Sequence, residues 1–203
     1  MRQRLSQDAR RTDILTQALR LFRTKGYAAT EMEDIRLACG ISRGGLYHHF
    51  GGKAAILSAL VASETSQLAQ ILEGPGGDPI AALLTAGSAH LGADPGVLST
   101  LTSDEDRLTY LGFLDRAIAS ELRPVLERRL ANAVTPDVQP SHVAELFLSV
   151  NSLINRRTVL NEWSGAEAAS FAGTALGLLA PCMQDPAGLR GLARQLAAQG
   201  GLA

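Results

Sequence analysis

The chain has 203 residues, of which 46% are hydrophobic and 19% charged, so it can form a packed core and is not intrinsically disordered. Its two cysteines are far apart in the sequence, which excludes a disulfide framework and a CxxC metal site. No apolar stretch is long enough for a membrane span, and none follows the charged N-terminus as in a signal peptide. We therefore expect a soluble, cytoplasmic protein that makes no contact with a membrane.

Charge is distributed unevenly along the chain. Residues 1–57 hold ten basic and five acidic residues, a net charge of +5, whereas the remainder holds nine basic and fifteen acidic residues, a net charge of −6. A basic segment suits a polyanion such as nucleic acid, and the acidic remainder would be repelled by it. Charge alone does not distinguish this interpretation from a chance imbalance, so the motifs within the basic segment decide.

Apolar residues recur at helical spacing from end to end, and the alternation typical of strands does not persist. We therefore predict an all-α protein of about nine or ten helices. The first helix is predicted over residues 7–25, where Ile14, Ala18 and Phe22 lie on one apolar stripe. Gly26 is expected to end it.

Two short helices are predicted next. Thr30 and Glu33 have the spacing of a capping box, which predicts a helix over residues 31–39. Ser42 is the expected N-cap of the following helix over residues 43–50. Two short helices joined by a tight Gly-Ile turn form a helix-turn-helix. Its small core is expected to contain Ile35, Ala38, Ile41, Leu46 and Phe50.

Many residues in this region agree at fixed spacing with a known pattern. They are Ile14-Leu15, Ala18, Leu21-Phe22, Gly26-Tyr27, Thr30, Asp34-Ile35, Ala38, Gly40-Ile41-Ser42, Gly44, Leu46-Tyr47, His49-Phe50, Lys53 and Leu57. On these residues the segment 14–57, about a fifth of the chain, resembles the DNA-binding region of the TetR family of bacterial transcriptional repressors. The chain departs from that family at Gly45, where a larger residue is common, and at Ala54, where an acidic residue is common.

The resemblance implies a set of contacts with the DNA backbone. Thr30, Tyr47 and Lys53 would contact phosphates, which position a protein on DNA without reading its sequence. Several arginines near the N-terminus are further candidates for lying along the backbone or in the minor groove, with solvated disorder as the alternative. These are Arg2, Arg4, Arg10 and Arg11.

The resemblance also implies which residues read bases. Arg43 is the main candidate, because a guanidinium matches the major-groove edge of guanine. Gly44 and Gly45 would allow close approach to the groove. Ser42 is a further candidate DNA-binding residue, and His48 is a further candidate for a base or phosphate contact. Two adjacent glycines weaken this helix by about 1 kcal/mol each relative to alanine.

The rest of the chain is predicted to be a helical body. Further helices are expected over residues 53–73, 80–91, 97–101, 104–133, 141–163, 166–181 and 186–198. Pro124 is expected to kink the longest of them. The helix over 141–163 is apolar on nearly all faces, and the helix over 166–181 is rich in small residues. The resemblance implies that these two helices form a four-helix interface with the same helices of a second subunit in a homodimer. The core of a single monomer is the alternative. Two-fold symmetry predicts a palindromic operator on double-stranded DNA.

We expect a three-helix helix-turn-helix DNA-binding domain over residues 1–54 and a ligand-binding and dimerisation domain over residues 55–203. The second domain is expected to bind a small-molecule effector, and its apolar composition predicts an apolar one. For any single candidate lining residue, core packing or solvent exposure is the favoured interpretation. The candidates are His90, Tyr110, Phe113, Arg116, Asn151, Asn155 and Trp163.

Other functions remain open from the sequence. A ligand-independent or architectural DNA-binding protein would share the same N-terminal segment, and a helical adaptor would bind protein alone. An enzyme is disfavoured, because His90 and His142 are the only histidines outside the DNA-binding segment. Adjacent His48 and His49 point about 100° apart on a helix and do not share a metal. We expect no catalytic site, metal or cofactor, and repression relieved by ligand as the mechanism, with activation as the alternative.

Overall fold

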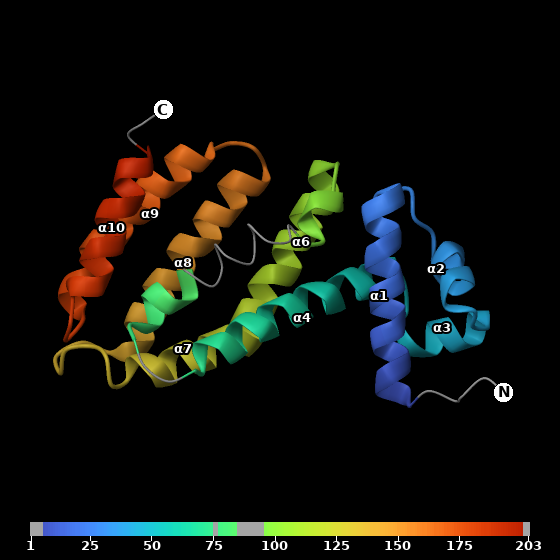
Figure 1. The fold of residues 1–203 in the computed structure, drawn as a ribbon, viewed down its shortest axis with the longest axis horizontal. Helices are drawn as coiled ribbons and strands as arrows, with labels where there is room; N and C mark the ends of the chain where they lie inside the picture. Colours follow the sequence, from blue (N-terminus) through green and yellow to red (C-terminus); the bar gives the residue numbers. More distant parts are fainter. Residues whose placement is uncertain (1–5, 75–76, 85–95, 201–203) are drawn as a thin grey trace. The chain divides into compact units, whose positions relative to one another are not determined.

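The computed structural model describes residues 6–74, 77–84 and 96–200. These residues are mostly helical and include no strand, which confirms the predicted all-α class (Figure 1). The chain divides into two compact units. The N-terminal unit comprises Met1–Glu64 and Pro95–Leu114, and the C-terminal unit comprises Thr65–Asp94 and Asp115–Ala203.

Three helices and the start of a fourth form most of the N-terminal unit. These are α1 (Gln7–Lys25), α2 (Met32–Cys39), α3 (Arg43–His49) and α4 (Lys53–Leu72), which continues into the C-terminal unit. The bounds of α1 are those predicted from its apolar stripe. The buried side chains of this unit include Ile14, Ala18, Phe22, Ile35, Leu46, Phe50, Ile56 and Leu57.

The predicted core of the helix-turn-helix is partly correct. Ile35, Leu46 and Phe50 are buried as expected, and Ile41 is half-buried. Ala38 is exposed, so its predicted place in this core is wrong. The chain reverses at Gly40, whose φ of +61° lies in the left-handed region that favours glycine.

The start of α2 differs from the sequence prediction. Its N-cap is Glu31, whose N–H donates to the Asp34 carboxylate at 2.8 Å, so the expected capping pair of Thr30 and Glu33 is wrong. The physical reason is that Thr30 turns inward. Its side chain is buried, and its hydroxyl donates to the carbonyl oxygen of Gly26 at 2.7 Å.

A later segment of the chain completes the N-terminal unit. It contains the short 3₁₀ helix η1 (Leu98–Thr100) and most of α6 (Asp104–Ala117). The backbone N–H of Tyr27 donates to the carbonyl oxygen of Thr100 at 3.2 Å. This bond joins η1 to the turn between α1 and α2.

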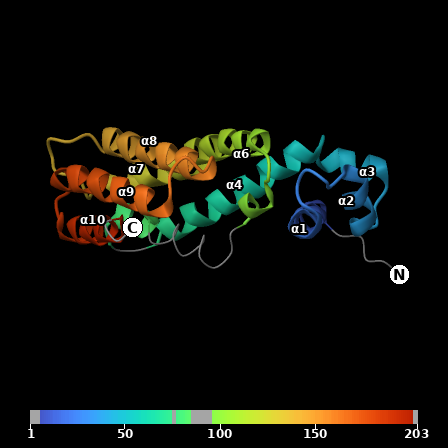
Figure 2. The same ribbon diagram turned by 90° about the horizontal axis from the view of Figure 1, so that it is seen from above.

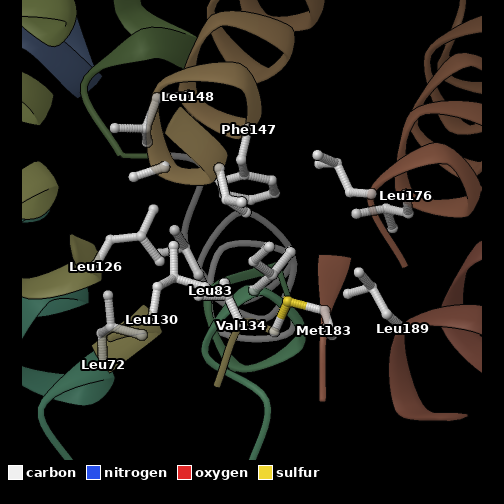
Figure 3. Close-up of a cluster of buried hydrophobic side chains, with 14 of the residues drawn as sticks. Leu72, Leu83, Leu126, Leu130, Val134, Phe147, Leu148, Leu176, Met183 and Leu189 are labelled. Atoms are coloured by element: carbon white, nitrogen blue, oxygen red, sulfur yellow. The ribbon is translucent and has the colours of Figure 1, made fainter. Parts of the chain in front are cut away.

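The C-terminal unit is also helical. Residues 79–84 form a helical segment, and α9 and α10 lie side by side (Figure 1, Figure 2). Side chains from several of its helices meet in one apolar core that includes Leu126, Phe147, Leu176 and Leu189 (Figure 3). Beyond α6 its named elements are η2 (Ile118–Leu122), α7 (Arg123–Leu130), α8 (Pro140–Val159), α9 (Gly165–Leu179), η3 (Ala180–Cys182) and α10 (Ala187–Gly200).

The long helix predicted over residues 104–133 is interrupted where a kink was expected, but the interruption comes ahead of the proline. The segment η2 is π-helical, and the N–H of Arg123 reaches back five residues to the carbonyl oxygen of Ile118. Pro124 is then the second residue of α7, where its missing N–H costs no helical hydrogen bond.

Among the described helices, α4 alone is long and apolar enough to cross a membrane by the criteria of length and composition. Its apolar residues have another explanation, because several of them are buried in the two units. These are Ile56, Leu57, Val61 and Leu72.

Candidate nucleic-acid interface

One face of helix α3 packs against its own unit, and the opposite face is exposed. Ser42 caps its start, since the Ser42 hydroxyl accepts the N–H of Gly45 at 3.1 Å. Leu46 is buried and anchors the inner face, whereas Arg43 and Tyr47 are exposed on the outer face. A short, capped helix anchored on one side can therefore place its outer face in a DNA groove.

The outer face carries the residue types that bind nucleic acid. The Arg43 guanidinium lies 5.6 Å from the centre of the Tyr47 ring, one helical turn away. Gly44 and His48 are exposed, and space beyond Gly44 is open, with no heavy atom within 4 Å of where a Cβ would lie. Bare backbone at Gly44 thus permits close approach by a partner.

A hollow of about 630 Å³ adjoins this face. Residues of α2, α3 and the start of α4 line it, and it brings together Thr30, Arg43, Tyr47 and Lys53 from the predicted set. Ser42, Gly44, Gly45 and His48 belong to α3 or its cap but do not line the hollow. Glu31 and Glu33 also line it, and Arg36 is paired with Glu33, so Arg43 and Lys53 are the cations of the lining that suit a phosphate or another anion.

Arg36 also lines the hollow, and the sequence analysis missed it. Its guanidinium donates to both carboxylate oxygens of Glu33, at 2.9 and 2.7 Å, and to the carbonyl oxygen of Ile41 at 3.0 Å. These bonds to Arg36 hold the pKa of Glu33 below its ordinary value. Arg36 therefore fixes the turn between α2 and α3. The available sequence signal was the i, i+3 spacing of Glu33 and Arg36 on a predicted helix.

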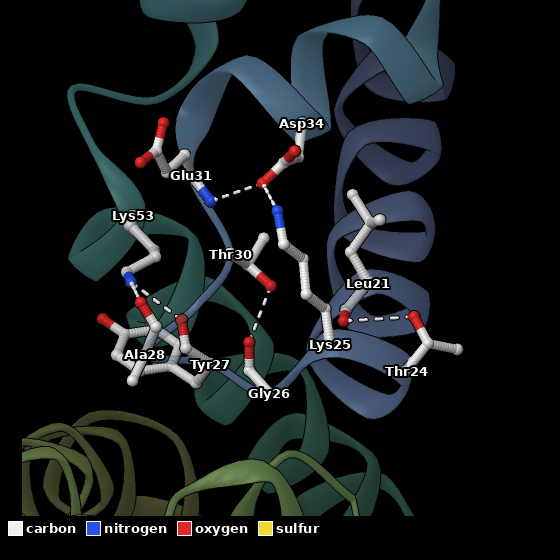
Figure 4. Close-up of polar contacts among 10 residues, drawn as sticks. All are labelled: Leu21, Thr24, Lys25, Gly26, Tyr27, Ala28, Thr30, Glu31, Asp34 and Lys53. Carbon is white, nitrogen blue, oxygen red and sulfur yellow. Dashed lines mark hydrogen bonds and ion pairs between the residues drawn. The ribbon is translucent and has the colours of Figure 1, made fainter.

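Lys53 is held at the start of α4 by the turn that precedes α2. Its ammonium donates to the carbonyl oxygens of Tyr27 at 2.8 Å and Ala28 at 3.1 Å (Figure 4). In the same region Lys25 donates to the Asp34 carboxylate at 2.6 Å. This contact, together with the N–H of Glu31, holds the pKa of Asp34 below its ordinary value.

Thr30 lies at the edge of the same hollow but does not offer its hydroxyl to a partner. The residue is fully buried and its hydroxyl donates to Gly26 (Figure 4). The backbone N–H of Thr30 is also used, since it donates to the carbonyl oxygen of Tyr27 at 3.2 Å. The phosphate contact expected of Thr30 is therefore better replaced by a role in shaping the turn.

The predicted ligand-binding residues are divided between the two units. Tyr110 and Phe113 lie in the N-terminal unit, where burial, and secondarily the charge of Glu64, raises the pKa of Tyr110 above its ordinary value. The candidates in the C-terminal unit are Arg116, Asn151, Asn155 and Trp163. His90 lies outside the described residues.

Two of the C-terminal candidates, Asn151 and Trp163, contact residues close to them in the sequence. The Asn151 side chain donates to the carbonyl oxygen of Phe147 on its own helix at 2.9 Å. The ring of Trp163 packs against Phe171 of α9 with centroids 5.0 Å apart. Arg116 is exposed, and Asn155 is half-buried. Neither the hollow beside α3 nor a second one between α9 and α10 is lined by any of the six described candidates.

Within 6–74, 77–84 and 96–200, no group of three or more histidine, cysteine, aspartate or glutamate residues is placed to hold a metal ion. Burial and the nearby charge of Asp13 raise the pKa of the Cys39 thiol to about 11, so it is not a thiolate at neutral pH.

Known proteins share the segment that carries this interface. Residues 14–60 match the family model described as bacterial regulatory proteins, tetR family. The HTH-type transcriptional regulator YerO of Bacillus subtilis is 48% identical over 44 residues, which make up 22% of this chain and 15% of that protein. Matches to several other relatives span 26% to 34% of their lengths, so the chain covers about a third or less of these proteins.

Other similarities extend over most of the chain. The HTH-type transcriptional regulator EthR of Mycolicibacterium smegmatis is 29% identical over 169 residues, 77% of this chain and 76% of that protein. The solved SmeT–triclosan complex has a TM-score of 0.56 and 21% identity, over 87% of this chain and 93% of that chain. The structural match shows a shared fold.

Proposed function

Because the chain belongs to the TetR family of bacterial regulatory proteins, we propose that it controls transcription by binding double-stranded DNA through its N-terminal unit. The observation that carries this proposal is the exposed face of α3 beside a hollow whose lining includes Arg43 and Lys53. Arg43 and Tyr47 on that face stand next to Lys53. The net charge of +5 on residues 1–57 favours the approach of DNA.

Each residue of the interface has a distinct proposed role. Arg43 reads a base in the major groove, and Tyr47 and Lys53 contact phosphates. Gly44 and Gly45 allow close approach of the helix to the groove. Ser42 holds the start of α3, and His48 supplies a further polar contact at its exposed end. Thr30 shapes the turn. The proposed DNA-binding domain spans residues 1–54, and the ligand-binding and dimerisation domain spans residues 55–203.

The protein is proposed to act as a homodimer. Two side chains on α8, Leu146 and Leu153, and two on α9, Phe171 and Leu178, are large, apolar and exposed. In each helix the pair is seven residues apart, so it lies on one stripe. A second copy of the same stripes would cover them, and the resulting two-fold axis would match a palindromic operator.

We further propose that the regulator is a cytoplasmic repressor released by an apolar small molecule bound in the C-terminal unit. SmeT, which shares the fold, was solved with triclosan. The ligand would need different affinities for the DNA-competent and DNA-incompetent states. A ligand-independent, architectural role of the same DNA-binding unit is the competing function.

DNA binding is tested by fluorescence anisotropy with the intergenic duplex upstream of the protein's own gene, across a salt series. Arg43→Ala should abolish the preference for this duplex over a scrambled one, and Tyr47→Phe should weaken binding to both duplexes. Arg190→Ala, which removes an exposed arginine from α10, is the control for lost charge. Weak binding that ignores sequence and all three changes would contradict an operator-binding regulator at that site.

Effector release uses the same assay. Apolar compounds that raise the midpoint of thermal unfolding are added to the protein–duplex complex. A fall in anisotropy supports a ligand-released repressor. Stabilising compounds that leave the complex intact favour the architectural function.

A further inference from the structure

Arg11 of α1 lies against the end of α3. Its guanidinium carbon is 4.4 Å from the centre of the Phe50 ring. One of its N–H groups also donates a long hydrogen bond of 3.5 Å to the carbonyl oxygen of His49. His49 is the last residue of α3 and Phe50 is its C-cap, so both contacts are made at the same end of the helix.

This helix depends on contacts from outside itself. It has only seven residues, and two of them, Gly44 and Gly45, weaken it relative to alanine. A helix this short is not stable alone in water, so its orientation is set by what it packs against. Leu46 and Phe50 are buried and supply apolar anchors, and Ser42 caps the start.

Arg11 supplies a hydrogen-bond donor and a positive charge at the C-terminal end of α3. The last carbonyl groups of a helix have no N–H partner within the helix, and they form its negative end. A cation placed there is stabilising, and a guanidinium over an aromatic ring adds a cation–π attraction. Because Phe50 is itself buried, Arg11 covers a ring that belongs to the core of the unit.

We propose that Arg11 is a positioning residue that orients α3, and through it Arg43, and that it does not contact DNA. This rests on the proposed function, because it concerns how well α3 reads a sequence. It also differs from the expectation that arginines near the N-terminus lie along the DNA backbone. The two roles predict different salt dependences of DNA affinity. Losing a phosphate contact lowers the number of counterions released on binding, whereas losing a positioning contact leaves that number unchanged.

The first test compares wild type with Arg11→Ala on two duplexes, one selected by the wild type from a random pool and one scrambled. Arg11→Ala should weaken binding to the selected duplex about fivefold, the scale of one cation–π contact. Affinity for the scrambled duplex and the salt dependence should stay unchanged. Equal weakening on both duplexes, with the slope of log affinity against log salt lower by about one, would overturn the proposal.

Arg20→Ala is the matched control, because Arg20 is an exposed arginine of the same helix whose side chain donates to Gln17 at 3.1 Å. It removes the same charge from α1 without touching α3. A loss of sequence preference as large as that of Arg11→Ala would overturn a specific role for Arg11.

The second test needs no DNA. The amide protons of Leu46 and Phe50, which are hydrogen-bonded at 3.0 Å each, should exchange faster in Arg11→Ala than in wild type or Arg20→Ala. Unchanged exchange would refute the positioning role even if DNA binding fell. If the wild type selects no duplex, the proposed function fails, and the exchange experiment still decides whether Arg11 orders α3.

Discussion

The Lys53 ammonium donates to the carbonyl oxygen of Tyr27 and at the same time lies 4.4 Å from the centre of the Tyr27 ring (Figure 4). One side chain thus fastens the start of α4 to the turn between α1 and α2. An ammonium has three N–H groups, and two of them are used by the carbonyl oxygens of Tyr27 and Ala28. The third is available for a phosphate in the proposed complex with DNA.

Lys53→Met should therefore have two effects. It keeps most of the apolar stem but loses both hydrogen bonds, which should lower the free energy of unfolding in urea by about 1–2 kcal/mol. It should also weaken binding to all duplexes alike and lower the salt slope by about one. Arg20→Met, which changes an exposed cation of α1, should leave stability nearly unchanged. Equal stability of Lys53→Met and wild type would show that the turn does not depend on Lys53.

The carboxylate of Asp34 makes stability depend on pH. The pKa of Asp34 is lowered, mainly by Lys25 and then by the N–H of Glu31, so the ionised form stabilises the folded state. That contribution is fully present above the unfolded pKa and is lost as the pH falls through the lower folded pKa. The difference in thermal unfolding midpoint between wild type and Asp34→Asn should be constant at neutral pH and shrink below about pH 4.

The Asp34 prediction has an internal control. Lys25→Met removes the larger cause of the lowered pKa while leaving the carboxylate in place, so it should reproduce part of the same pH dependence. A wild-type advantage over Asp34→Asn that persists unchanged at pH 2 would contradict the linkage.

Two glycines of α9 should respond oppositely to alanine. A Cβ on Gly173 would lie 2.7 Å from the carbonyl oxygen of Ala193 and 2.9 Å from the nitrogen of Ala197, both in the backbone of α10. Gly173→Ala should lower the free energy of unfolding by about 1–3 kcal/mol, because the backbone of α10 cannot move aside as easily as a flexible side chain. Gly177→Ala, with no heavy atom within 4 Å, should raise it by about 0.5–1 kcal/mol. Urea unfolding that ranks the two variants the other way would refute this close crossing.

The exposed stripes of α8 and α9 predict how the protein assembles. Leu178 is 76% exposed, and a glutamate there would place charge inside the proposed dimer interface. Leu178→Glu should sediment as a monomer in analytical ultracentrifugation at concentrations where wild type is a dimer. Ile71→Glu changes an equally apolar residue of α4, 56% exposed, and should leave the dimer intact. A dimeric Leu178→Glu would place the interface elsewhere.

Trp163, the only tryptophan of the chain, offers a second readout of that assembly. It packs against Phe171, one of the four exposed apolar residues on the two stripes. Its fluorescence maximum should therefore shift when Leu178→Glu removes the partner, and should not shift in Ile71→Glu.

Local sequence signals predicted much of the fold. The apolar stripe of Ile14, Ala18 and Phe22 and the following Gly26 gave the bounds of α1, because both features act within a few residues. The start of α2 was misplaced, since the inward turn of Thr30 depends on its bond to Gly26 within a folded turn. Ala38 fits an apolar pattern, yet it is exposed because a short helix buries only one narrow face.

The candidate site also has some residues that the local sequence predicts and others that it does not. The outer face of α3 follows from its spacing, so Arg43 and Tyr47 could be named in advance. The contacts of Arg36 with Ile41 and of Arg11 with His49 could not be predicted, because each arginine donates to a backbone carbonyl oxygen, and a carbonyl carries no sequence signature. Arg11 reaches His49, 38 residues away along the chain. The small residues of α9 indicated a close helix crossing. The sequence does not say which helix crosses there, and the fold shows that it is α10 of the same chain, beside Gly173.

The π-helical turn before α7 also determines which insertions and deletions the C-terminal unit can accept. An α-helix advances about 100° per residue, and a π turn takes up one residue more than an α turn. Deleting one residue from Ile118–Leu122 would therefore let the helix continue as regular α, while the residues after it keep their present directions relative to Ala117. Val125, Leu126 and Leu130 would stay buried, whereas a deletion within the regular turns of α7 would rotate the residues after it by about 100°. The π turn is therefore a place where the chain can lose one residue without changing the register of α7.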